Sequence, residues 1–168
     1  ATSHPIHLVL ASASPARLRT LRAAGLDPEV VVSAVDEDGV VARYGVTGAE
    51  DVVLVLARAK AEDVAGSLTP AEGAPTLVLG CDSMLELDGE VMGKPSDPDD
   101  ARRRWQRMRG RSGVLHTGHW LLDTARGGGC VGAVAATTVH FADVSDAEIE
   151  AYVASGEPLA VEVVQRAT

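Results

Sequence analysis

The side chains best suited to chemistry near the start of the chain follow an apolar run at Leu8–Ala11. Ser12 and Ser14 end this run, and Ser14 is a good N-cap for a helix that begins at the following proline. Arg17 then falls in the first helical turn, where the helix dipole disfavours a cation. A phosphate bound between Arg17 and the helix N-terminus would make this placement favourable. The residues therefore predict a phosphate-binding turn; a capped helix with a solvated arginine is the alternative.

Two acidic side chains and two lysines are the next candidates. The chain has thirteen arginines but only two lysines, Lys60 and Lys94, which favours a need for a compact ammonium group at both positions. Glu37 and Asp82 each follow a predicted strand, and such positions meet at the ligand crevice of open α/β sheets. Carboxylates from two loops suit Mg²⁺, which is commonly held by one or two of them together with substrate phosphates. We therefore expect a polyphosphate and metal site; turn residues and solvated lysines are the simpler alternatives.

Composition limits the classes of function. At 168 residues the chain is long enough for one domain, and its net charge of −9 argues against a nucleic-acid-binding surface. Six arginines between Arg102 and Arg111 indicate the solvated face and C-terminal end of a helix, and Arg111 is also a candidate for binding. Cys81 and Cys130 form no recognisable disulfide framework or zinc site. No signal-peptide pattern or membrane-length apolar run is seen, so we expect a cytoplasmic protein without a membrane partner.

The elements that must position these side chains follow from hydrophobic periodicity and caps. Asp88-Gly89 predicts a hairpin over residues 84–92, and Val35–Gly39 reads as an acidic loop at the end of a strand. Thr47 and Ser145 each begin a capping-box pattern. The predicted strands are 7–12, 29–34, 76–81, 114–123 and 131–142, with a glycine turn at 127–129, and the predicted helices are 15–25, 47–66, the arginine-rich segment after Asp97, and 145–155. This alternation predicts an α/β fold with a mixed sheet.

Several other site patterns are excluded. His116 and His119 lie three residues apart on a predicted strand, so they point to opposite faces and are not expected to share a metal. The chain has no Walker A motif, no Gly-x-Gly-x-x-Gly after a strand and no Gly-x-Ser-x-Gly elbow. A P-loop enzyme, a Rossmann cofactor site and a serine hydrolase are therefore not expected.

Taken in order, the motifs resemble those of the Maf family, the septum formation inhibitor-like nucleoside triphosphate pyrophosphatases. The resemblance covers about residues 7–159, and the ordered set is specific although each motif alone is weak. The matching pieces are Ala11–Arg17, Val35–Glu37, Ala59–Ala61, Gly80–Ser83, Leu87–Glu90, Gly93–Pro95, Gly110-Arg111, His116–Gly118 and Ala151–Pro158.

This resemblance implies a single domain over residues 1–168, with the two-lobed, elongated mixed α/β fold of the inosine triphosphatases around a central cleft. It implies Mg²⁺- or Mn²⁺-dependent hydrolysis of a nucleoside triphosphate, including non-canonical or modified ones (house-cleaning), to a monophosphate and pyrophosphate. A homodimer is also implied. The roles carried over are catalysis for Asp82, Glu37, Lys60 and Lys94, metal binding for Glu37 and Asp82, and substrate binding for Ser12, Ser14, Arg17, Ser83 and Arg111.

The chain departs from the family pattern at three places. Ala16 stands where many members have an arginine, and Ser83 where others often have Thr or Gln; both neighbourhoods bear on base choice. Members usually continue after Glu-Pro-Leu into a cleft-lining segment, so we expect a segment to be missing near 159–162. Two alternatives stay open: a non-catalytic nucleotide-binding regulator of cell division or septum formation, and a flavodoxin-like binding module, against which the missing glycine-rich phosphate loop argues.

Overall fold

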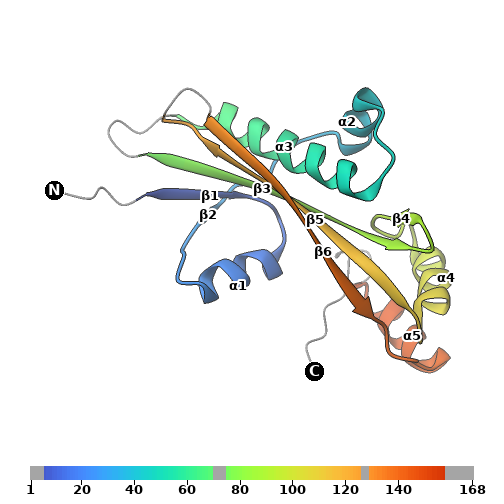
Figure 1. Cartoon of the computed structure of the whole chain (residues 1–168). Coiled ribbons are helices and arrows are strands. Elements are labelled where there is room, and N and C mark those ends of the chain that lie inside the picture. The colour runs from blue at the N-terminus through green and yellow to red at the C-terminus, as the bar shows by residue number, and fades with distance from the viewer. Residues whose placement is uncertain (1–5, 70–74, 126–128, 158–168) are drawn as a thin grey trace. The chain divides into compact units, whose positions relative to one another are not determined.

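The computed structural model describes residues 6–69, 75–125 and 129–157, which form helices and a six-stranded sheet (Figure 1). The predicted mixed α/β class is confirmed. The strands are β1 (His7–Ala11), β2 (Glu29–Val30), β3 (Thr76–Leu87), β4 (Glu90–Met92), β5 (Ser112–Asp123) and β6 (Gly129–His140). The helices are α1 (Pro15–Ala23), α2 (Glu37–Tyr44), α3 (Ala49–Ser67), α4 (Pro98–Met108) and α5 (Asp146–Ala154).

The sheet combines parallel and antiparallel pairs. Its strand order is β2-β1-β3-β5-β6, with β4 paired to β3. The strand β1 runs parallel to both neighbours, with Leu10 opposite Val30 of β2 and Leu79 of β3. Parallel strands need a crossover connection, and α1 lies in the one from β1 to β2. The pair β3–β4 is antiparallel, which makes the sheet mixed.

The chain divides into two compact units, one of residues 1–82 and 117–135 and the other of residues 83–116 and 136–168. The long strands β3, β5 and β6 each contribute residues to both units. The single two-lobed domain with a cleft stays a prediction.

In the first unit, α3 packs on the sheet through an apolar face. Ala61 and Val64 of α3 form a buried cluster with Val9, Ala11 and Val78 of β1 and β3. This apolar contact explains why α3 forms despite its several β-branched valines. It also fixes the face of α3 that meets β3, the strand that carries Asp82.

Two glycines allow the sheet to approach α3 closely. A Cβ added at Gly80 of β3 would collide with the Ala57 carbonyl oxygen and with Ala61. A Cβ at Gly118 of β5 would collide with the Val53 backbone. Only glycine fits at such a contact. The helix is therefore held against β3 at Gly80, two residues before Asp82.

The second unit is built on the predicted hairpin and two capped helices. Asp88 and Gly89 both have positive φ, 53° and 77°, as a two-residue turn of type I′ requires. Asp97 caps α4, and Ser145 forms the predicted capping box of α5. Trp105 packs against two buried clusters of this unit.

Four local predictions were wrong. The strand predicted at 29–34 is only Glu29–Val30. Residues 37–39 begin helix α2, because the Asp36 side chain accepts a hydrogen bond from the Gly39 N–H and caps it. Thr47 starts no capping box, since the N-cap of α3 is Gly48 and has no side-chain hydrogen bond. The strand predicted to end at 81 continues to Leu87.

The remaining element predictions agree with the structure to within a few residues where it describes them. The helix predicted at 15–25 is α1, capped by Ser14 and followed by Gly25 with a φ of 85°. The last two strands are present as β5 and β6. The glycine turn expected at 127–129 and the missing segment expected at 159–162 fall wholly or mainly outside the described residues.

Candidate functional site

The site begins with a lysine on the buried face of α3. Lys60 lies one residue from Ala61, which is part of the core of the first unit. Its Nζ donates to Oδ1 of Asp82 at 2.6 Å and lies 2.9 Å from Oε1 of Glu37. Three elements thus meet at one ammonium group: α3 supplies Lys60, β3 supplies Asp82 and the first turn of α2 supplies Glu37.

Burial and charge act in opposite directions on Lys60. Burial lowers its pKa because it removes water from the ammonium group, but the ion pairs with Asp82 and Glu37 more than offset this and raise the pKa overall. Lys60 is therefore protonated at neutral pH. The Asp82 side chain is fully buried, and the charge of Lys60 compensates it, as a buried carboxylate requires.

Glu37 and Asp82 fit a divalent cation by their chemistry. Both are hard oxygen ligands, and each already has a carboxylate oxygen within 2.9 Å of the same cationic atom, Lys60 Nζ. Together they carry one more negative charge than Lys60 neutralises. Within residues 6–69, 75–125 and 129–157, no group of three or more His, Cys, Asp or Glu residues could hold a metal ion. Water and substrate phosphates would have to complete a metal site here, as is common for Mg²⁺.

The predicted phosphate-binding turn lies between β1 and α1. The Oγ of Ser14 accepts a hydrogen bond from the Arg17 N–H at 3.4 Å and caps α1. The Oγ of Ser12 accepts one from the Ser14 N–H at 3.2 Å and one from Arg17 Nη1 at 2.8 Å. The three predicted side chains thus form one hydrogen-bonded cluster at a helix N-terminus, where the dipole attracts anions.

The turn and the lysine cluster are linked through β3. Arg17 Nη1 also donates to the carbonyl oxygen of Cys81 at 3.4 Å, and Cys81 directly precedes Asp82. The first unit thus brings together six of the predicted site residues: Ser12, Ser14, Arg17, Glu37, Lys60 and Asp82.

The other three predicted residues belong to the second unit. Ser83 follows Asp82 on β3, and Lys94 is exposed just after β4. Arg111 donates two hydrogen bonds to the Asp88 carboxylate, at 2.5 and 2.6 Å, and so fastens the hairpin turn. The Arg111 guanidinium holds the pKa of Asp88 below its usual range.

Two site residues lie on elements other than those predicted. Asp82 is inside β3 rather than at its end, and Glu37 is in the first turn of a helix rather than in a loop. Sequence reasoning also missed the Cys81 carbonyl oxygen as a partner of Arg17. The sequence feature that indicates this contact is the apolar run that continues into Gly80-Cys81, because a strand there presents backbone carbonyl oxygens as acceptors.

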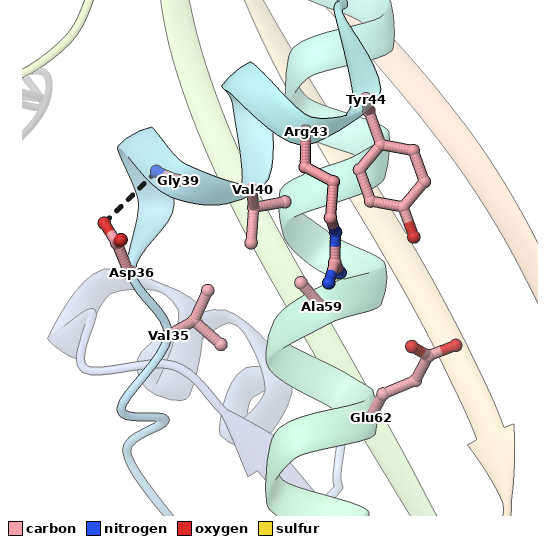
Figure 2. Close-up of a pocket in the computed structure, with 8 residues that line it drawn as sticks. All are labelled: Val35, Asp36, Gly39, Val40, Arg43, Tyr44, Ala59 and Glu62. Carbon is pink, nitrogen blue, oxygen red and sulfur yellow. Dashed lines mark hydrogen bonds between the residues drawn. The ribbon is translucent and has the colours of Figure 1, made fainter.

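A pocket of about 450 Å³ opens between α2 and α3 (Figure 2). Two of its lining residues, Asp36 and Ala59, directly precede Glu37 and Lys60 in the sequence. Its lining includes two carboxylates, Asp36 and Glu62, which disfavour a phosphate there. Arg43 and Tyr44 of α2 also line the pocket, and the Arg43 guanidinium lies 5.4 Å from the centre of the Tyr44 ring. None of the nine predicted site residues lines this pocket. Its full lining is Val35, Asp36, Gly39, Val40, Arg43, Tyr44, Ala59 and Glu62.

Among the described residues, no helix has the length and apolar character needed to cross a membrane.

Comparison with known proteins finds the same family as the ordered motifs of the sequence. The model of the Maf-like protein family matches residues 7–162. A nucleoside triphosphate pyrophosphatase of Salinispora tropica is 58% identical over 159 residues, which cover 95% of this chain and 68% of that protein. One of Streptomyces coelicolor is 56% identical, with 92% and 71% covered. A HAM1 protein from Coxiella burnetii has a TM-score of 0.43 at 15% identity, with 93% and 95% covered. The chain belongs to the Maf-like protein family.

Proposed function

We propose that this chain hydrolyses nucleoside triphosphates to a nucleoside monophosphate and pyrophosphate. The observation that carries the proposal is the pair of links around Asp82: Lys60 joins it to Glu37, and Arg17 joins the neighbouring Cys81 to the β1–α1 turn. The names and the 52–58% identity of the curated relatives support the same activity.

The residues of the first unit have distinct parts in this reaction. The N-terminus of α1, Ser14 and Arg17 bind phosphate oxygens, and Lys60 neutralises charge on the chain of phosphates. Glu37 and Asp82 would hold Mg²⁺ or Mn²⁺, and the bound metal would neutralise charge on the triphosphate. Asp82 also takes a proton from the attacking water. The water oxygen bonds to the α-phosphorus, and the bond from that phosphorus to the α–β bridging oxygen breaks, so pyrophosphate leaves.

Lys94, Ser83 and Arg111 are proposed for the same reaction on the strength of their motifs. Lys94→Ala is expected to lower turnover, with incomplete rescue by Lys94→Arg, because a guanidinium does not reproduce a compact ammonium. Full activity of the Arg variant would remove this argument. Arg111 already pairs with Asp88, so Asp88→Asn serves as the control for effects of Arg111→Ala that arise from the hairpin alone.

The deciding experiment reads products rather than loss of substrate. Canonical and modified nucleoside triphosphates are incubated with Mg²⁺ or Mn²⁺ in ¹⁸O-labelled water. The products are then separated, and their masses are measured by mass spectrometry. Label in the monophosphate, with unlabelled pyrophosphate, is expected for attack at the α-phosphorus. Orthophosphate and a diphosphate would identify a γ-phosphatase instead. Tight nucleotide binding without products would favour the non-catalytic regulator.

The metal, the assembly and the compartment are tested separately. Chelation by EDTA is expected to abolish turnover, and added Mg²⁺ or Mn²⁺ to restore it. Light scattering of the purified protein is expected to give the mass of a homodimer, and fractionation of cells is expected to find the protein in the cytoplasm. A monomer mass or turnover in EDTA would overturn the corresponding part of the proposal.

A further inference from the structure

The position of Lys60 raises a question that the proposed reaction leaves open. Its ammonium group contacts one oxygen of each proposed metal ligand, at 2.6 Å for Asp82 and 2.9 Å for Glu37. A cation shared by these same two oxygens would meet Lys60 at close range. Two cations repel strongly in a site where one carboxylate is fully buried and the lysine side chain is 11% exposed.

We propose that Lys60 is a built-in counter-ion of the Glu37–Asp82 pair, which keeps a divalent cation out until nucleotide phosphates draw its ammonium away. The second half of this inference rests on the proposed function. The first half concerns the protein alone, because it states that Lys60 and a divalent cation compete for the same two carboxylates.

The charges favour this exchange. With Lys60 in place the cluster carries one net negative charge, and without it two. An ammonium has three N–H donors, and two of them are directed at carboxylates. A triphosphate near the β1–α1 turn offers oxygens that can accept from the same group. Lys60 can then change partners while it stays protonated, and the two carboxylates become available together.

Lys60 also explains how the protein tolerates the pair without a metal. Asp82 is fully buried, and a buried carboxylate that loses a directly bonded opposite charge strongly destabilises a fold. The lysine thus keeps Asp82 and Glu37 in place in the free protein. This makes Lys60 a positioning residue for the two carboxylates as well as a phosphate ligand.

The test measures binding of Mn²⁺ alone, without nucleotide, by electron paramagnetic resonance. Lys60→Met is expected to bind Mn²⁺ at least about tenfold more tightly than the wild type, because a cation is removed from contact with both ligands. Arg19→Met, an exposed cation of α1 in the same unit, removes the same charge and is expected to leave Mn²⁺ affinity unchanged. The double variant Lys60→Met/Asp82→Asn is expected to lose the gain.

Two further measurements keep the outcome decisive. If Lys60→Met unfolds without metal, Lys60→Gln is used, and Mn²⁺ is expected to raise the Tm of the neutral variant more than that of the wild type. Equal Mn²⁺ affinities in the wild type and both neutral variants would overturn the exchange, whether or not the wild type hydrolyses nucleotides. Tighter Mn²⁺ binding by a chain that yields no pyrophosphate would instead overturn the proposed function and leave the competition standing.

Discussion

The guanidinium of Arg17 is bonded to the backbone of Cys81, sixty-four residues away in sequence, through its donation to the carbonyl oxygen. This contact ties the N-terminus of α1 to the strand position directly before Asp82. An arginine in the first turn of a helix is unfavourable toward the helix dipole. Its placement is explained by its hydrogen bonds to Ser12 Oγ and Cys81 O, and by the phosphate that we propose it binds.

Arg17→Lys is expected to raise KM for the nucleoside triphosphate by about tenfold, with a smaller fall in kcat. A lysine keeps the charge but cannot reproduce the planar fork that serves two acceptors and a phosphate together. Steady-state kinetics check this, with Arg19→Lys on the exposed side of the same helix as the control. Equal KM values for the two variants would remove Arg17 from substrate binding.

Asp82→Asn is expected to lower kcat by at least about a hundredfold, the usual range for the loss of a general base. The amide cannot take a proton from water and is a weaker metal ligand. Asp27→Asn is the matched control, since that side chain is 88% exposed and outside the site. Circular dichroism must show that the Asp82 variant is folded. Near wild-type kcat in a folded Asp82→Asn variant would contradict the proposed mechanism.

The helix caps and the hairpin were predictable because their chemistry is local. Ser14, Asp97 and Ser145 each accept a hydrogen bond from a backbone N–H three residues later, and the Asp88-Gly89 turn needs positive φ at both positions. Such signals depend on a few neighbouring residues. From them the start of three helices and the turn of one hairpin are predicted correctly.

The two wrong placements in the site have a tertiary origin. A charged residue normally marks the end of a buried strand, and for this reason the sequence predicts a strand that ends just before Asp82. Asp82 instead bonds to Lys60 of α3, twenty-two positions earlier in the chain. Because this contact compensates the buried carboxylate, the strand continues through Asp82. Glu37 begins a helix of only eight residues that includes Gly39 and two valines, all weak helix formers. The Asp36 cap and the packing of α2 on α3 stabilise it instead.

Asp100 gives the expected pH dependence of the second unit. The Ser96 backbone N–H, followed by the Arg104 guanidinium, lowers the pKa of Asp100 below its ordinary value of 3.8. A carboxyl with a lowered pKa stabilises the fold above its ordinary value, and this stabilisation is lost as the pH falls through the lower, folded-state pKa. The free energy of unfolding of the wild type is therefore expected to fall toward that of Asp100→Asn below about pH 3.8. Urea titrations of both proteins between pH 3 and 6 check this, and a constant difference across that range would contradict it.

Gly80→Ala tests the contact that holds α3 beside Asp82. A Cβ at Gly80 would collide with the Ala57 carbonyl oxygen and Ala61, and the backbone of a packed helix cannot yield as a flexible side chain can. The variant is expected to lose about 1–3 kcal/mol of unfolding free energy, the usual cost of overpacking, and to lower turnover because Lys60 shifts away from Asp82. Gly66→Ala on the same helix is the matched control, since a Cβ there meets nothing within 4 Å. It is expected to leave activity unchanged and to add up to about 1 kcal/mol of stability, as alanine favours a helix over glycine. Equal stability and turnover in the two variants would show that the close approach of β3 to α3 does not position the site.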